Sequence, residues 1–169
     1  SDYSECDLEV IYTPHVYNAA VKNSGGATLC TFTYTVEDLP EDVIDEPQKL
    51  EGYTFDGWFT DSKYKKPFSG KFSDYVDSSL VLYPHYSLSG WSITWNLNGG
   101  ELSVDFIDSY TILTDLTLPD GDMVKKQGYE LDGWMLNGKK IDYFVPTVMC
   151  DVTLTAIWTP VNYSITYIL

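Results

Sequence analysis

Carboxylates are the most abundant side chains in this sequence that could carry out chemistry. Six of them crowd the segment 37–46, where two could act as general acid and base, and Asp115, Asp120 and Asp122 could offer oxygen ligands to calcium. No spacing selects a catalytic pair in 37–46, and the three aspartates lack the D-x-D-x-D-G pattern with a distal Glu. We therefore expect a solvated acidic face in 37–46, and no metal ion or other cofactor.

Histidine and cysteine offer nucleophilic or metal chemistry, and their positions argue against both. His15 and His85 have no serine or cysteine partner in a recognisable nucleophile motif. Cys6, Cys30 and Cys150 form no C-x-x-C pair, which disfavours a zinc site. The apolar stretch around Cys30 favours a small buried side chain, and the spacing leaves a Cys6–Cys30 disulfide open. These patterns predict a protein that is not an enzyme.

The aromatic side chains are the better candidates for binding. Trp58 and Trp134 could stack on sugar rings or anchor a hydrophobic core, and their recurrence in one sequence block favours the core. Trp91 follows a glycine at a junction, where we expect it to be half-exposed, either packing between units or marking a binding surface. Tyrosines in polar loops offer adaptable contact area. The candidate exposed contact residues are Trp91, Tyr64, Tyr75 and Tyr143.

Charge and hydropathy limit the partners that the chain can have. The 169 residues contain 10 Lys+Arg, all of them lysine, and 25 Asp+Glu, so the net charge is −15. A chain of this charge repels nucleic acid and anionic membrane surfaces, and without arginine it lacks bidentate recognition of phosphate. No apolar run is long enough to insert into a membrane. The partners that remain are proteins and neutral glycans.

The sequence of the elements that must position these side chains is repeated along the chain. Gly52-Tyr53-Thr54-Phe55-Asp56-Gly57-Trp58 returns at an offset of 76 as Gly128-Tyr129-Glu130-Leu131-Asp132-Gly133-Trp134. After this block the offset falls to 72, and the length difference maps onto the turn that follows each tryptophan, as expected for a loop. We read two full units, 16–88 and 89–160. Residues 161–169 match the first strand of a truncated third unit, and 1–15 resemble the tail of a preceding one.

The pattern within each unit predicts strands. Apolar residues alternate with polar ones over 31–36, 92–97 and 152–158, the period of a half-buried strand. Asn98-Gly99-Gly100 supplies a turn, and the only short helices that fit lie near 37–44 and 114–118. The fold class expected is mainly β, α+β at most, with little helix. A first strand without its unit should dock on a sheet edge, so Tyr163–Leu169 offers strand exchange with another chain.

These motifs together resemble the Listeria–Bacteroides repeat, the B repeat of internalin-type surface proteins. The second unit carries its Asn-Gly-Gly turn, a Leu-Pro loop at 118–119, the Lys-x-Gly-Tyr block at 126–134 and a closing strand at 154–158. The resemblance implies β-grasp-like modules in tandem on a bacterial surface or secreted protein. It implies a non-catalytic spacer and adhesion module that binds host or neighbouring proteins. The alternative is a carbohydrate-binding accessory module of a surface enzyme.

Overall fold

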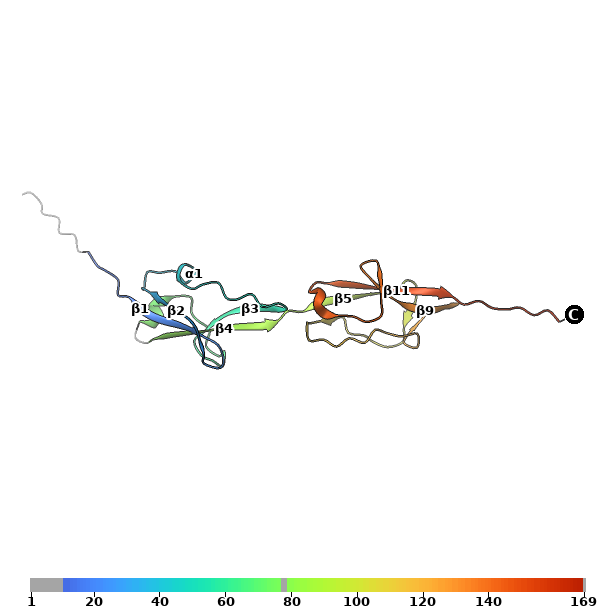
Figure 1. Ribbon diagram of the computed structural model, residues 1–169, viewed down its shortest axis with the longest axis horizontal. Coiled ribbons are helices and arrows are strands. Elements are labelled where there is room, and N and C mark those ends of the chain that lie inside the picture. The colour runs from blue at the N-terminus through green and yellow to red at the C-terminus, as the bar shows by residue number, and fades with distance from the viewer. Residues whose placement is uncertain (1–10, 77–78, 169) are drawn as a thin grey trace, which may run out of the picture. The chain divides into compact units, whose positions relative to one another are not determined.

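The computed structural model describes residues 11–76 and 79–168, which form two compact units (Figure 1). Unit 1 contains residues up to 50 together with 54–87, and unit 2 contains 88–168 together with 51–53. The possible Cys6–Cys30 disulfide involves Cys6, which lies outside the described residues. Most of segment 1–15, the possible tail of a preceding unit, also lies outside them. Each unit has its own sheet and its own hydrophobic core.

Unit 1 is built on a four-stranded sheet with the order β2-β1-β4-β3. Strand β1 is antiparallel to β2 and parallel to β4, so the parallel pair lies in the centre of the sheet. Polar and apolar residues alternate along these strands, which places one side of each strand in the core. The elements in chain order are β1 (Tyr17–Lys22), β2 (Thr28–Tyr34), the one-turn helix α1 (Pro40–Val43), β3 (Tyr53–Phe59), the 3-10 turn η1 (Phe72–Tyr75) and β4 (Leu80–Leu88).

Unit 2 has a five-stranded sheet with the order β10-β9-β11-β5-β7 and a separate two-stranded ribbon of β6 and β8. Here β5 and β11 form the central parallel pair. Strands β9 and β10 form a hairpin, because Asn137 and Gly138 both adopt positive φ, the conformation of a type I′ turn. The elements are β5 (Trp91–Asn96), β6 (Glu101–Leu102), β7 (Ser109–Tyr110), β8 (Val124–Lys125), β9 (Tyr129–Leu136), β10 (Lys139–Ile141), the 3-10 turn η2 (Pro146–Val148) and β11 (Val152–Pro160).

The register of the central strand pair is the same in the two units. Ala19 lies opposite Leu80 in unit 1, and Ile93 lies opposite Val152 in unit 2. Ala19 and Ile93 are 74 residues apart, as are Gly25-Gly26 and Gly99-Gly100. Leu80 and Val152 are 72 apart, the offset of the repeat after the tryptophan block. The two units therefore align residue by residue in space as well as in sequence.

A buried tyrosine ties each core to the chain segment that leads into the last strand. In unit 1 the hydroxyl of Tyr34 donates a 2.8 Å hydrogen bond to the carbonyl of Tyr75, and in unit 2 Tyr110 donates at 2.6 Å to the carbonyl of Cys150. Tyr34 and Tyr110 are 1% and 2% exposed, respectively. Because a buried hydroxyl must find a partner, this repeated bond anchors Tyr75 in unit 1 and Cys150 in unit 2 to the core tyrosine.

Most of the expected elements are present, and three expectations are wrong. The alternating strand at 152–158 and the short helix within 37–44 are confirmed, whereas 114–118 forms no helix. Residues 161–168 form no strand, and Tyr163 and Ile165 are 78% and 77% exposed. Cys30 is an exposed free thiol: it shares its face of β2 with Phe32 and Tyr34, but it lies at a cleft beyond the core. The 3-10 turns η1 and η2 were not predicted.

Candidate functional site

A cleft of about 600 Å³ opens on unit 1, and we call it the unit 1 cleft. Three aromatic side chains, Trp58, Tyr64 and Tyr86, contribute to its wall from β3, from the loop after β3 and from β4. The other lining residues come from the β1–β2 hairpin, the loop after α1 and β4, and they are Val21, Asn23, Ser24, Leu29, Cys30, Asp45, Glu46, Pro47, Gln48, Leu50 and Pro84. A concave, mostly apolar site with a few polar groups is the usual form of a small-ligand site.

The aromatic wall of the unit 1 cleft is held in place by packing from within the unit. The ring of Phe55 contacts the edge of Trp58 at a centroid distance of 5.3 Å and that of Tyr86 at 5.5 Å. Edge-to-face contacts of this kind favour one orientation of each ring. The backbone carbonyl of Trp58 also accepts a hydrogen bond from Phe68 N–H at 2.8 Å. The rings are therefore oriented before any ligand arrives.

The loop that forms the polar rim is tied to the same wall. The hydroxyl of Tyr86 donates a 2.8 Å hydrogen bond to the carbonyl of Gln48, and burial raises the pKa of this phenol. Asp45 and Glu46 precede that anchor and are exposed at the rim. The unit 1 cleft therefore combines flat apolar faces with two carboxylates, and none of its lining residues is cationic.

Tyr64 reaches the unit 1 cleft from a tight turn. Its backbone has φ of 54°, and Asp61 shapes the turn by accepting the N–H groups of Lys65 and Lys66 at 2.9 and 2.7 Å. The ring of Tyr64 packs on that of His85 at a centroid distance of 4.4 Å. This turn is the segment in which unit 1 is longer than unit 2, so unit 2 has no equivalent of Tyr64.

The corresponding tryptophan of unit 2 is buried, and it borders a smaller hollow of about 340 Å³. Trp134, which the repeat aligns with Trp58, is 1% exposed, and its indole N–H donates to the carbonyl of Pro119 at 2.7 Å. Trp58 is only half-buried, and within the described part of the chain its indole N–H has no protein acceptor. Because no described buried polar atom lacks a partner, the Trp58 N–H must reach solvent.

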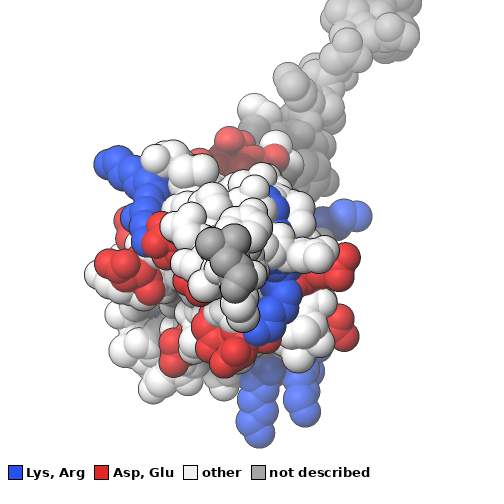
Figure 2. All heavy atoms as spheres, turned by 90° about the vertical axis from the view of Figure 1, so that its right-hand side faces the viewer, with Lys and Arg blue, Asp and Glu red and all other residues white. Residues whose placement is uncertain are grey.

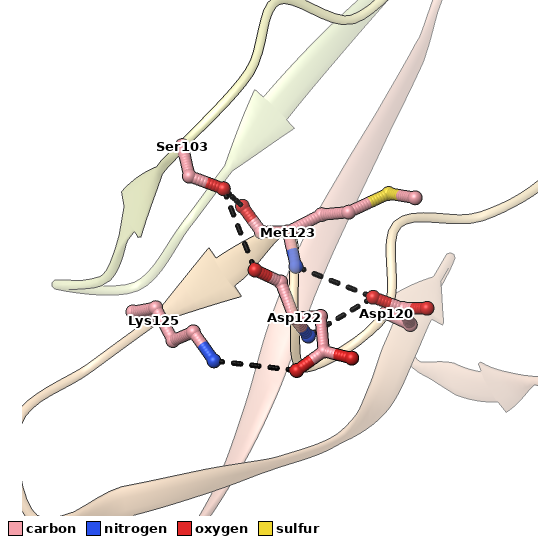
Figure 3. A network of polar contacts seen from close by, with 5 residues as sticks. All are labelled: Ser103, Asp120, Asp122, Met123 and Lys125. Atoms are coloured by element: carbon pink, nitrogen blue, oxygen red, sulfur yellow. Dashed lines mark hydrogen bonds and ion pairs between the residues drawn. The ribbon is translucent and has the colours of Figure 1, made fainter.

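In unit 2 the ribbon of β6 and β8 adds Val124 to the core that contains Trp134. At its start the Asp120 carboxylate accepts the N–H groups of Asp122 and Met123 at 2.9 and 3.2 Å, and Ser103 Oγ donates to the carbonyl of Met123 (Figure 3). Val124, the first residue of β8, is 1% exposed. At the repeat offset of 76, unit 1 has Ile44 in place of Asp120. The side chain that shapes the turn is absent, and the described residues 45–50 form no strand.

Comparison with known proteins agrees with this internal duplication. The model of the Listeria-Bacteroides repeat domain matches residues 19–85 and again residues 91–157. The chain belongs to the Listeria-Bacteroides repeat family. The first repeat domain therefore contains the unit 1 cleft, and the second contains the smaller hollow beside the buried Trp134.

Two relatives of the repeat come from Evansella cellulosilytica. One, named "Putative Gly-rich membrane protein", is 25% identical over 72% of this chain and 14% of its own length. The other, named "Putative membrane protein", is 24% identical over 90% of this chain and 22% of its own length. The chain thus spans less than a quarter of each of these relatives. No solved structure matches the chain. Among the described residues, no helix is both long and apolar enough to cross a membrane.

The four predicted contact residues occupy different environments in the two repeat domains. Tyr143 is 72% exposed. Trp91 is half-buried and packs on Tyr110 at a centroid distance of 5.5 Å. Tyr64 lines the unit 1 cleft. Tyr75 was expected to be exposed, and this is wrong: its ring packs against the unit 1 core at 5.2 Å from Phe68.

The tryptophans expected in the cores divide in the same way. Trp134 is in the core as predicted, and Trp95 and Trp158 are partly buried with indole N–H groups bonded to backbone carbonyls at 2.9 Å each. Trp58 packs only partly against the core and borders the cleft. Sequence reasoning missed the cleft because Trp58 and Trp134 stand in the same motif. The available signal was the replacement of Asp120 by Ile44.

Of the groups with potential for chemistry, Asp45, Glu46 and Cys30 line the unit 1 cleft, and the others lie outside its lining. In the 37–46 segment, Asp38 accepts the N–H of Thr35 at 2.6 Å, and the carboxylates of α1 are exposed. His85 pairs with Asp56 at 2.8 Å, and Ser87 donates to the same carboxylate at 2.8 Å. The serine contacts the aspartate rather than the histidine, which is not the geometry of a nucleophile and its base. The described residues contain no group of three metal-ligating side chains.

The charged side chains are distributed rather than gathered. Figure 2 shows lysines and carboxylates interspersed over the face in view, with uncharged surface between them. Individual pairs such as Lys140 and Asp132, 2.9 Å apart, are half-exposed. On the face in view the lysines therefore lie among carboxylates, and the net charge of the chain is −15.

Proposed function

We propose that this pair of repeats is a non-catalytic part of a bacterial cell-surface or secreted protein, where it acts as a spacer and adhesion module. The observation that carries the proposal is the repeated use of the same residues for folding. The central strand register and the tyrosine-to-carbonyl bond recur in both units, so most of the repeated motif builds two independent cores. Tandem units that fold on their own cores are suited to setting distances between other domains.

Exposed aromatic and aliphatic side chains supply the proposed adhesive surface. Tyr143 lies in the loop between β10 and η2, beside Val145, which is 43% exposed. Tyrosine gives large contact area at low entropic cost, and an acidic surface keeps polyanions away. The proposed partners are host or neighbouring proteins and neutral glycans. Strand exchange through Tyr163–Leu169 is a further proposed mode, for which the exposure of Ile165 and Tyr167 offers apolar contact area.

Surface shaving tests the proposed location. Intact cells that produce the whole protein are treated with trypsin, and the released peptides are identified by mass spectrometry. Peptides that span the two repeats are expected from intact cells, with a cytoplasmic protein as the lysis control. Release of these peptides only after the cells are broken would contradict a surface location.

A bead assay tests adhesion separately. Beads coated with the chain are expected to bind host-cell protein extracts, and Tyr143→Ala is expected to reduce binding. Leu113→Ala is the matched control, because Leu113 is 68% exposed in a different loop of the same unit. Equal binding by beads coated with the wild-type chain and with bovine serum albumin would exclude adhesion and leave only the spacer role.

A further inference from the structure

We propose that the unit 1 cleft binds a neutral saccharide. This rests on the proposed adhesive function and deepens it, because it assigns a ligand class to one repeat and not to the other. The internal comparison is the first argument: the same sequence block gives a fully buried tryptophan beside a hollow of about 340 Å³ in unit 2, and a half-buried one at a cleft of about 600 Å³ in unit 1. The lining of the unit 2 hollow includes the cation Lys140, whereas that of the unit 1 cleft includes three aromatic residues and no cation.

The unit 1 cleft offers the two kinds of contact that a sugar ring needs. Trp58, Tyr64 and Tyr86 present aromatic rings, whose faces carry partial negative charge and attract the C–H groups of a pyranose. Asp45 and Glu46 accept hydroxyl hydrogens at the rim. The indole N–H of Trp58, which no described protein group accepts, remains available to donate.

Charge and desolvation separate a saccharide from other occupants. An anionic ligand would meet two carboxylates and no cation in the unit 1 cleft, so its binding is opposed. An apolar peptide side chain would cover Asp45 and Glu46 without giving their oxygens a hydrogen-bond donor, which is costly. Neutral hydroxyls satisfy those oxygens while the ring covers the aromatic faces. The anchor between Tyr86 and Gln48 keeps the rim in position, so little ordering is required on binding.

Two exposed free cysteines provide a built-in probe. Cys30 lines the unit 1 cleft, and Cys150 lies in unit 2 outside it. Alkylation of each thiol by iodoacetamide is followed by mass spectrometry with and without neutral hexasaccharides of glucose, N-acetylglucosamine, xylose or mannose. At a ligand concentration about ten times Kd, one hexasaccharide is expected to slow alkylation of Cys30 about tenfold and to leave Cys150 unchanged.

Calorimetry with variants assigns the binding to the cleft. Tyr64→Asn removes a ring from the wall while keeping a residue that tolerates positive φ, and Glu46→Gln removes a rim charge on an exposed side chain. Each is expected to weaken the saccharide's affinity about tenfold or more, whereas Leu113→Asn, on an exposed residue of unit 2, leaves it unchanged. Circular dichroism spectra matching that of the wild type establish that both variants are folded.

The outcomes decide between the occupants. Failure of all four hexasaccharides to protect Cys30 at about 10 mM overturns the proposal, as does equal protection by hexagalacturonate, an anionic analogue. Protection of Cys30 by an extended peptide, with none by the sugars, would assign the cleft to protein ligands and also overturn it. None of these results affects the surface shaving assay, so failure of glycan binding and failure of the surface role remain distinguishable.

Discussion

Removing the two equivalent tryptophans one at a time should have unequal effects on stability. Trp134 is 1% exposed and bonded to Pro119, whereas Trp58 is half-buried at the unit 1 cleft. We therefore expect Trp134→Ala to destabilise unit 2 much more than Trp58→Ala destabilises unit 1. The comparison uses one motif, one substitution and one chain, so side-chain chemistry is held constant and only the environment differs.

The expected magnitudes follow from burial and hydrogen bonding. Replacing a fully buried tryptophan by alanine costs about 3–5 kcal/mol, and leaving the buried carbonyl of Pro119 without its donor adds about 1 kcal/mol or more. Trp58→Ala removes a side chain that is only half-buried and whose indole makes no described hydrogen bond. The substitution should therefore cost about 2 kcal/mol. A unit of this size has a total stability of about 4–10 kcal/mol. Trp134→Ala should therefore bring unit 2 close to unfolding.

Hydrogen exchange in increasing urea measures each unit separately, because peptides from β4 report on unit 1 and peptides from β11 on unit 2. Trp134→Ala should remove most protection from β11 and leave β4 largely protected. Tyr143→Ala is the control for an exposed aromatic and should change either unit by less than about 0.5 kcal/mol. Equal losses of stability for the two tryptophan variants would refute the inference that Trp58 is less buried in unit 1 than Trp134 is in unit 2.

Three further predictions concern the polar contacts and the turn. Burial raises the pKa of Tyr34 and Tyr110, so the stability that they contribute is complete below their ordinary pKa near 10 and is lost as the pH rises through their pKa values in the folded state. Thermal melts of the double variant Tyr34→Phe, Tyr110→Phe should lack this loss of stability at alkaline pH. The hydrogen bonds from Ser92 lower the pKa of Asp151, so its stabilisation is complete above its ordinary value near 4 and is lost as the pH falls through the folded value; Asp151→Asn should flatten acid unfolding of unit 2 followed by circular dichroism. Gly138→Ala should cost about 1 kcal/mol in urea unfolding, because its φ of 76° strains any residue with a Cβ, and an unchanged midpoint would contradict the type I′ turn.

Local pattern was sufficient to predict the central strands. Val152, Leu154 and Ala156 alternate with polar residues in the sequence, and all three are buried in the structure. The offset between repeats also predicted which residues recur together, because two units with the same register bury the same positions. These features depend on period and spacing alone, which a single sequence records directly.

Features that depend on neighbouring strands were not predictable in this way. Cys30 sits in an apolar stretch that suggested burial, yet it lies on the edge strand β2 where the core gives way to the unit 1 cleft, and it is exposed there. Tyr75 lies in a polar loop that suggested exposure, yet η1 turns it onto Phe68. The burial of Cys30 and Tyr75 depends on the order of the strands and on the path of the loop, and the local sequence does not record either.

The two repeats share a framework and differ in two segments, the loop that precedes β3 or β9 and the turn that follows each motif tryptophan. In unit 2 the Asp120 carboxylate folds the loop so that β8 pairs with β6 and Val124 enters the core. In unit 1 Ile44 takes that place and is itself 9% exposed, so the loop has an apolar anchor and no side chain to accept its N–H groups. The loop then runs to the Gln48 carbonyl, which Tyr86 holds, and Trp58 is left at the surface of the cleft. Because the central parallel strands keep the same register in both units, this rearrangement leaves the framework intact, and a spacer repeat can acquire a binding site without losing its core.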